Sequence, residues 1–240
     1  MLLHLPTSVT EAQECMARDA VPIGGATLVW AGWQRDGFPE HAMSLRELPE
    51  ANAIEREALG AAVVLHRIDD RVPEALRRAA ASVGTGAVRR TATVGGNLVG
   101  SALRCLLPAA LVLDARAVTL EPDGTYETGL SDALGKRHLL LGIRWREPVT
   151  SGYHKQPAEA GGPPPLVVAT AVHADTAGRT HLRVAVRDGY DVLTATTPCG
   201  TDPEQALHAL EPTGIGSLPP AARDVVRRQV CDIVTRPAGG

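Results

Sequence analysis

The sequence predicts an α+β fold built in two parts. Apolar residues at helical spacing alternate with short strand-like runs in the first half, and strand-like segments dominate from Ala117 onward. The stretch Gly152–Pro165 is rich in glycine and proline, with three consecutive prolines, and is the best candidate for a linker. We therefore expect a boundary near residue 155. The expected parts are an N-terminal domain over 1–154, with subdomains of about 1–55 and 56–154, and a smaller α+β domain over 155–240.

Composition places the chain among ordinary globular proteins. Its 240 residues are 44% hydrophobic and 21% charged, which is enough to bury a sizeable core. Aromatic residues make up only 3%, so we expect an aliphatic core. The net charge of −3 provides no general attraction to nucleic acid or to an anionic membrane. No apolar run approaches the ~20 residues that a membrane helix needs.

The four cysteines favour a reducing compartment. Cys15, Cys105, Cys199 and Cys231 are widely spaced, and none forms a pair at CxxC distance. Disulfides, or a zinc or iron–sulfur site of the chain's own, are therefore not expected. We expect a cytoplasmic protein.

Capping residues and periodicity predict the elements of the first half. Ser8 and Glu11 form a capping-box pattern that starts a short helix ending near Arg18. Further helices are expected over Pro73–Val83 and Leu106–Ala115. Strands or extended segments are expected at Val21–Ile23, Leu28–Trp30 and 58–65, and a loop at Thr91–Asn97.

The second half reads as strands followed by helices. Turn residues separate the predicted strands, as in Asp175–Gly178, which we expect to close a hairpin. Two helices are expected at the end, one starting at Thr201–Glu204 and one over Pro219–Val234. The expected strands are Ala117–Leu120, His138–Trp145, Leu166–Ala174 and His181–Arg187.

Several common sites are absent from the sequence. It contains no GxGxxG fingerprint and no Gly-x-Ser-x-Gly elbow, which leaves an ordinary NAD site or a serine hydrolase unsupported. The eight histidines do not cluster at metal-ligand spacing. His173 and His181 are expected to face each other across the hairpin as two neutral imidazoles.

Two glycine-containing segments need an explanation. They are Pro22–Leu28 and Arg89–Leu98, each with an adjacent glycine pair. Without a Cβ atom, a glycine pair lets a phosphate approach the backbone and receive amide hydrogen bonds. Two tight turns are the plainer reading of the same glycines. From the residues alone, both a dinucleotide or phosphate site and two turns remain open.

The second segment resembles a known flavin loop. The run RRTATVGGNL, followed by an apolar helix and LDARAVTL, is similar to the second loop of the FAD-binding (medium) subunits of molybdenum hydroxylases. This group includes the carbon monoxide dehydrogenase medium subunit and the xanthine dehydrogenase flavin domain. Its first loop has the form AGGTDL and its second the form ATIGGN, for which this chain has Ile23–Leu28 and Thr93–Asn97. The resemblance covers most of the chain.

The resemblance implies a two-part FAD-binding α/β domain of the molybdopterin dehydrogenase type, followed by the smaller C-terminal domain. The backbone amides of the four glycines would neutralise the pyrophosphate, and Thr93 and Asn97 would position it. Lys155 would extend toward the flavin, where a cation favours the anionic reduced ring; its residue chemistry alone suggests a solvated linker lysine. The implied cofactor-binding residues are Ile23, Gly24, Gly25, Ala26, Thr27, Leu28, Thr93, Gly95, Gly96, Asn97, Arg104 and Lys155.

The chain also departs from the family pattern. Ala26 and Thr27 replace the usual Thr-Asp pair of the first loop. The second loop usually continues as Ser-Pro-x-x-Asp, but this chain has Ser101–Cys105 with neither the proline nor the aspartate. Arg104 in this stretch could instead pair with a phosphate. The chain is also shorter than the usual subunit.

The residues and the resemblance leave three functions open. The chain could relay electrons from molybdenum and iron–sulfur partner subunits to an acceptor, or it could act alone as a FAD oxidoreductase on a small molecule. A non-redox binding or scaffold protein that has lost FAD is the third. The rare aromatics Trp30, Trp33 and Tyr153 could line the flavin or the substrate, although core packing is the plainer role for each tryptophan. No nucleic acid or membrane partner is expected, and a homo-oligomer is compatible with the sequence.

Overall fold

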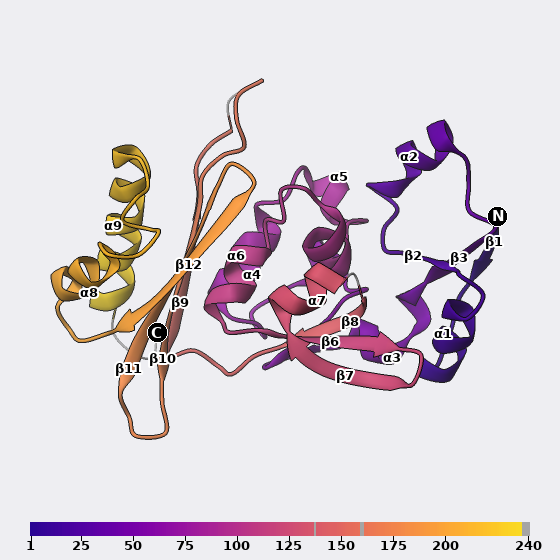
Figure 1. Cartoon of the computed structure of the whole chain (residues 1–240), viewed down its shortest axis with the longest axis horizontal. Coiled ribbons are helices and arrows are strands. Elements are labelled where there is room, and N and C mark those ends of the chain that lie inside the picture. Colours follow the sequence, from indigo (N-terminus) through magenta and orange to yellow (C-terminus); the bar gives the residue numbers. More distant parts are fainter. Residues whose placement is uncertain (137, 159–160, 237–240) are drawn as a thin grey trace. The chain divides into compact units, whose positions relative to one another are not determined.

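The computed structural model describes residues 1–136, 138–158 and 161–236, and these form two compact units. Figure 1 shows the course of the chain. Each unit is assembled from three segments, so the chain passes between the units five times. Unit 1 consists of Met1–Val72, Val83–Arg104 and Ala115–Trp145, and unit 2 of Pro73–Ser82, Cys105–Asp114 and Arg146–Gly240.

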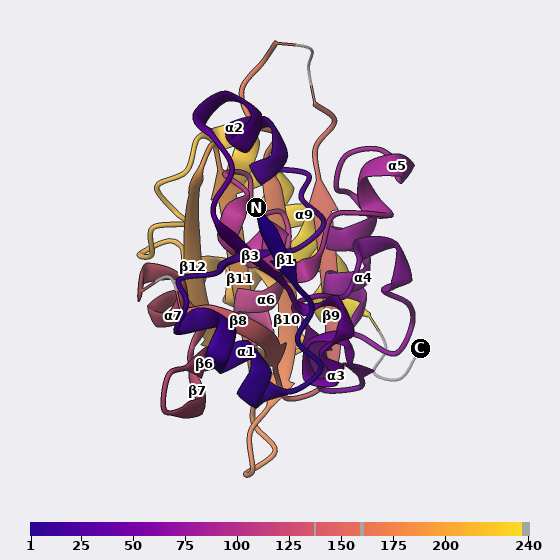
Figure 2. The ribbon, with the colours of Figure 1, turned by 90° about the vertical axis from the view of Figure 1, so that its right-hand side faces the viewer.

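Unit 1 begins with a small parallel sheet. The strands β1 (Leu2–His4), β2 (Val21–Ile23) and β3 (His41–Ser44) are arranged in the order β1-β3-β2. Helix α1 (Val9–Met16) connects the first two strands and is capped as the sequence predicts, since the Ser8 hydroxyl accepts the Glu11 amide at 3.3 Å. Helix α2 (Val29–Asp36) follows β2 directly, and Figure 2 shows it beyond the ends of these strands.

The second sheet of unit 1 is antiparallel. Its strands are β4 (Ile54–Glu55), β5 (Ala58–Gly60), β6 (Arg116–Glu121), β7 (Gly124–Gly129) and β8 (Leu139–Arg144), in the order β4-β5-β8-β6-β7. Apolar residues of β3, β6 and β8 pack with α1 in one cluster that includes Met43, Leu120 and Leu141. The helical segments of this part are η1 (Leu45–Glu47), α3 (Pro49–Asn52), η2 (Leu65–Arg67), α5 (Gly86–Arg89), the π-helix η3 (Gly96–Gly100) and α7 (Leu130–Lys136).

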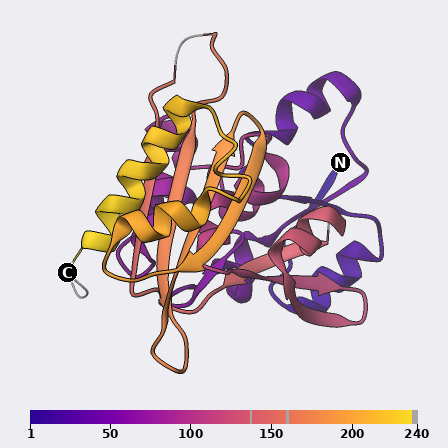
Figure 3. The same cartoon turned by 60° about the vertical axis from the view of Figure 1, so that its left-hand side comes forward.

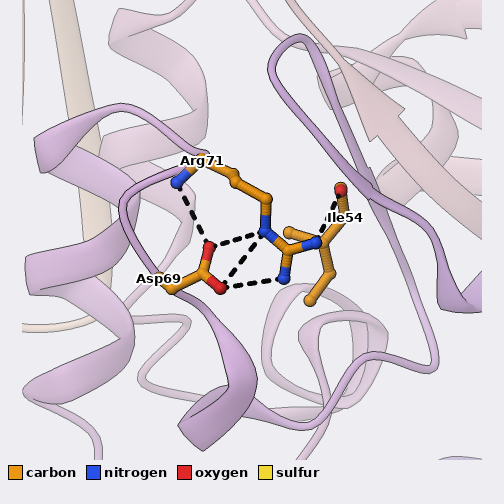
Figure 4. A network of polar contacts seen from close by, with 3 residues as sticks. All are labelled: Ile54, Asp69 and Arg71. Carbon is orange, nitrogen blue, oxygen red and sulfur yellow. Dashed lines mark hydrogen bonds and ion pairs between the residues drawn. The ribbon is translucent and has the colours of Figure 1, made fainter.

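A polar network fixes the turn that follows η2. The Arg71 guanidinium donates to the Asp69 carboxylate through Nε at 2.9 Å and Nη2 at 2.8 Å, and its Nη1 donates to the Ile54 carbonyl at 3.3 Å (Figure 4). The ion pair holds the pKa of Asp69 down at about 2. The turn is thereby tied to β4.

Unit 2 is a four-stranded antiparallel sheet between two pairs of helices. Its strands are β9 (Thr150–Lys155), β10 (Val167–Ala174), β11 (Thr180–Asp188) and β12 (Asp191–Pro198), in the order β12-β11-β10-β9. Helices α8 (Pro203–Leu210) and α9 (Pro220–Thr235) cover one face of this sheet, as Figure 3 shows. Helices α4 (Glu74–Ala81) and α6 (Leu107–Val112) pack on the other face (Figure 1).

Most of the predicted elements are present. The predicted helices over Pro73–Val83, Leu106–Ala115 and Pro219–Val234 correspond to α4, α6 and α9. The predicted hairpin is β10–β11, in which His173 and His181 are direct partners. His173 Nε2 lies 2.8 Å from the Val112 carbonyl, and burial lowers its pKa. The α+β fold class is confirmed.

Three local predictions are wrong. Leu28–Trp30 is not extended but enters α2, because the Trp30 amide donates to the Ala26 carbonyl at 3.1 Å. The apolar run 58–65 is a strand only over Ala58–Gly60, after which the chain turns. The predicted loop Thr91–Asn97 instead leads into the π-helix η3.

The predicted linker is wrong in its first part. Residues 152–155 belong to β9, which pairs with Val167–Val172 of β10. Glu159 and Ala160 of the predicted linker lie outside the described residues. The compact units also do not coincide with a division at residue 155, because α4 and α6 pack on the unit 2 sheet; the division into domains stays a prediction. None of the described helices is long and apolar enough to cross a membrane.

Candidate functional site

The two glycine segments meet inside unit 1. A Cβ atom placed on Gly24 would lie 2.2 Å from the Thr93 hydroxyl oxygen, and one on Gly25 would lie 1.6 Å from the Thr91 carbonyl oxygen. Both distances are far below any contact that a real Cβ atom makes. Glycine is therefore required at both positions so that the first segment can approach the backbone of the second. Segments about 70 residues apart in sequence form one site.

Thr93 stands at the junction of these segments. Its side chain is 5% exposed, and its hydroxyl oxygen accepts the Gly96 amide hydrogen bond at 3.2 Å. A hydroxyl that accepts in this way keeps its own hydrogen to donate. Thr93 thus orders the second segment, contacts the first and retains one donor.

The second segment is also held by its own backbone. The Gly95 amide donates to the Ala61 carbonyl at 2.8 Å, and the Asn97 amide donates to the Thr93 carbonyl at 2.9 Å. A Cβ atom on Gly95 would lie 3.0 Å from that of Ala61. The amides of Gly95 and Gly96 therefore already have acceptors within unit 1. The predicted phosphate donors that remain are the amides of Gly24 and Gly25 and the Thr93 hydroxyl.

The backbone around the site is locally strained. Ala26 has φ of 56° and Arg104 has φ of 38°, in the left-handed region that residues with a Cβ atom rarely adopt. Such conformations persist only where the surrounding structure imposes them, and they are concentrated at functional sites. The π-helix η3, which starts at Gly96, is a second irregularity of this kind.

The remaining predicted site residues have different positions. Ile23 ends β2, Thr27 lies between the first glycine pair and α2, and Leu28, at the N-terminus of α2, is 50% exposed. Asn97 is buried in η3, with 6% of its surface exposed. Arg104 is partly buried at the end of the second segment of unit 1. Their contacts with a cofactor stay predictions.

Lys155 belongs to unit 2 and is not a solvated linker residue. It ends β9, and its ammonium donates to the Ser82 carbonyl at the C-terminus of α4 at 2.8 Å. Cys105 Sγ lies 4.0 Å from Lys155 Nζ and 3.5 Å from Nη1 of the fully buried Arg187. The predicted role of Lys155 beside the flavin stays a prediction.

Lys155 also borders an open pocket of about 300 Å³. Tyr153 extends from the same face of β9, and its hydroxyl lies 3.2 Å from that of Ser82 and donates to the Cys105 carbonyl at 3.3 Å. Burial raises the pKa of Tyr153. The lining residues are Arg78, Ala81, Ser82, Tyr153, His154 and Lys155.

Sequence reasoning missed two partners of the glycine pairs. The Thr91 carbonyl fixes the approach of Gly25, and the Ala61 carbonyl accepts the Gly95 amide. Both act through backbone oxygens, which leave no side-chain signal. The aromatic residues of α2 were noted in the sequence, but their predicted core role is wrong for Trp30, which is 48% exposed.

Comparison with solved structures shows the same fold in CO dehydrogenase and in quinoline 2-oxidoreductase. A chain of the Cu,Mo-CO dehydrogenase in its cyanide-inactivated form matches with a TM-score of 0.74 and 20% identity, over 98% of this chain and 96% of that one. Reconstituted CO dehydrogenase from Oligotropha carboxidovorans matches with a TM-score of 0.73 and 20% identity, over 98% of this chain and 96% of that one. Quinoline 2-oxidoreductase from Pseudomonas putida 86 matches with a TM-score of 0.67 and 19% identity, over 98% of this chain and 94% of that one. The similarity thus extends over nearly the whole of each chain.

A family comparison identifies the N-terminal region. No match was found among curated proteins. The family described as "FAD binding domain in molybdopterin dehydrogenase" matches residues 1–139, which contain both glycine segments. The match confirms the predicted cofactor, FAD, and the predicted class of FAD-dependent oxidoreductase. Since it spans more than half of the chain and the fold agrees, the chain belongs to the family of FAD-binding domains of molybdopterin dehydrogenases.

Proposed function

We propose that the chain holds the pyrophosphate of FAD where its two glycine segments meet, and that it relays electrons from an iron–sulfur partner subunit to an acceptor. The observation that carries the proposal is the approach of Gly24 and Gly25 to Thr91 and Thr93. This approach gathers glycine backbone from two distant segments in one place. It lies inside the region that matches the FAD-binding family.

The residues present fit a pyrophosphate. Glycines let an anion approach the backbone, and the Thr93 hydroxyl supplies a donor at the same place. No Asp or Glu occurs in Ile23–Leu28 or in Thr91–Gly100, so neither segment brings a carboxylate that would repel phosphate. Arg104, six residues after the second glycine segment, is a candidate cation for the same group.

The protein's own contribution is to bind and orient the cofactor. Bound FAD supplies the capacity to accept two electrons together and to release them singly. The backbone amides and Thr93 neutralise the phosphates, and the backbone bonds from Gly95 and Asn97 keep the second segment in one conformation. A preorganised segment of this kind binds without paying an ordering cost.

The partners follow from what the chain lacks. Its cysteines are free and lie far apart in sequence, so in the relay an iron–sulfur partner subunit would supply the cluster and a molybdenum subunit the substrate site. Free thiols also support a reducing, cytoplasmic setting. A stand-alone oxidoreductase acting on a small molecule is the second candidate, favoured by the missing Ser-Pro-x-x-Asp segment.

FAD binding is tested on the purified full chain. We expect a yellow protein with bands near roughly 370 and 450 nm, as for oxidised flavin. The variant Gly96→Ala should lose FAD, because the new Cβ atom lies 3.1 Å from the Thr93 hydroxyl oxygen and touches no other group within 4 Å. Gly95 is less suitable, since a side chain there collides with Ala61.

Gly135→Ala is the matched control. Gly135 lies in α7 of the same unit, and a Cβ atom there meets nothing within 4 Å, so FAD content should stay at the wild-type level. A colourless wild-type protein that takes up no added FAD would overturn the proposal in favour of a non-redox protein. Copurification with molybdenum and iron–sulfur subunits supports the relay, whereas reduction of the isolated chain by a small substrate supports the stand-alone enzyme.

A further inference from the structure

Helix α2 leaves an aromatic cluster uncovered. None of its eight residues is buried, although it carries two of the chain's three tryptophans. Trp30 is 48% exposed, and Phe38, the only phenylalanine, is 47% exposed just after the helix. In a chain with so few aromatic residues, exposing this group needs a physical reason.

The three rings form one surface. The Trp30 and Phe38 ring centroids are 5.4 Å apart in an edge-to-face arrangement, and those of Trp33 and Phe38 are 6.1 Å apart. These spacings are typical of aromatic pairs that stabilise each other. Phe38 thus contacts both indoles. We call Trp30, Trp33 and Phe38 the α2 aromatic cluster.

The cluster begins within one helical turn of the first glycine segment. The Trp30 amide donates to the Ala26 carbonyl at 3.1 Å, so Trp30 lies one helical turn after the residue that follows Gly25. Leu28 also reaches the end of the π-helix η3, since its Cδ1 would be 3.4 Å from a Cβ atom on Gly100. The helix that carries the aromatic cluster therefore starts directly beside the first glycine segment.

We propose that the α2 aromatic cluster stacks against a planar ring of the dinucleotide whose pyrophosphate lies at the glycine segments, and that Trp30 makes the main stacking contact. A dinucleotide carries a flat heteroaromatic ring on each side of its pyrophosphate, within reach of residues beside the phosphate site. An indole is a suitable stacking partner for either ring, and stacking would cover the face that α2 leaves exposed. This inference rests on the proposed function.

The test uses the full chain and three ligands: FAD, ADP and FMN. Affinities are measured by calorimetry for the wild type, Trp30→Ala and Trp30→Phe. We expect Trp30→Ala to bind FAD about 5- to 100-fold more weakly, the range that ring stacking supplies, and Trp30→Phe to retain most of the affinity. A loss seen with ADP assigns the adenine to Trp30, and a loss seen with FMN assigns the isoalloxazine.

Tryptophan fluorescence provides a second readout. Added FAD should quench Trp30 emission, so Trp30→Phe should lose most of the quenching. Trp145→Phe is the matched control, because Trp145 is only 5% exposed and should contribute little to it. The melting temperature without ligand should fall only slightly in Trp30→Ala, since the indole packs on Phe38 but α2 buries no residue.

The outcomes separate this inference from the proposed function. If the wild type binds FAD and Trp30→Ala binds it equally well, the stacking inference is overturned and the FAD site stands. If the wild type binds no FAD, both are overturned. Weaker FAD binding in Trp30→Ala with an unchanged fold, restored by phenylalanine, supports the stacking role.

Discussion

Single residues set how closely the two glycine segments approach each other. Gly24 and Gly25 are glycines because the backbone of the second segment occupies the space of any side chain. Thr93 is the corresponding residue of the second segment, since its hydroxyl contacts Gly24 and also accepts the Gly96 amide. The two glycines are therefore required by the packing of the protein itself. Because they carry no side chain, their backbone amides also stay accessible to a phosphate.

Replacing Thr93 tests this role of its hydroxyl. Thr93→Val keeps the shape but removes the acceptor of the Gly96 amide, which should lower the free energy of unfolding by about 1–3 kcal/mol and weaken FAD binding. Thr93→Ser keeps the hydroxyl and should retain most of the FAD affinity. Urea unfolding and FAD titration of both variants measure the two effects. Equal FAD affinity in Thr93→Val and the wild type would show that the hydroxyl does not contact the cofactor.

At the scale of elements, the ion pair between Asp69 and Arg71 ties the turn after η2 to Ile54 of β4. The pKa of Asp69 falls from 3.8 to about 2, chiefly through hydrogen bonds from Arg71. A lowered pKa in the folded state means that the stabilisation is complete above the unfolded value and is lost as the pH falls toward 2. Because both side chains are exposed, the contribution is small.

The expected result is a pH-dependent difference between the wild type and Asp69→Asn. The variant should melt at a lower temperature at pH ~7, and the difference should narrow by pH ~3, below the ordinary pKa of 3.8, where the carboxyl group of the unfolded wild type is mostly protonated. Thermal unfolding monitored by circular dichroism at both pH values checks this. A difference that is the same at both pH values would assign the effect to packing rather than to charge.

Elements with strong local signals were predictable, and those that depend on partners were not. Helix α4 has Pro73 at its start and apolar residues at helical spacing, and the β10–β11 hairpin has an Asp-Thr-Ala-Gly turn. Strand β9 lies in a segment that reads as linker, and only its pairing with β10 makes it a strand. The glycine pairs were recognisable in the sequence, but their backbone partners at Thr91 and Ala61 were not, because any residue supplies a carbonyl.

At the scale of the whole molecule, the two units share one chain in an interleaved order. Helices α4 and α6 come from the first half of the sequence, yet they cover the sheet of unit 2. Their buried residues are small or aliphatic and include Leu76, Ala79 and Leu107. A cut at residue 155 therefore separates these helices from most of the sheet that buries them.

Fragments 1–154 and 155–240 test whether the predicted domains fold alone. The first fragment keeps α4, α6 and all of β9 except Lys155 but lacks β10 and β11, so the apolar faces of both helices would be exposed. The second fragment keeps α8 and α9 on β10–β12 but exposes the opposite face of the sheet to solvent.

We expect fragment 1–154 to bind a hydrophobic dye and to unfold without a cooperative transition, because exposed apolar surface of this extent destabilises a compact state. The full chain, assayed in parallel, should unfold cooperatively. A cooperative transition and undiminished FAD binding in fragment 1–154 would instead support a domain boundary at residue 155, and would show that α4 and α6 do not need the sheet they cover.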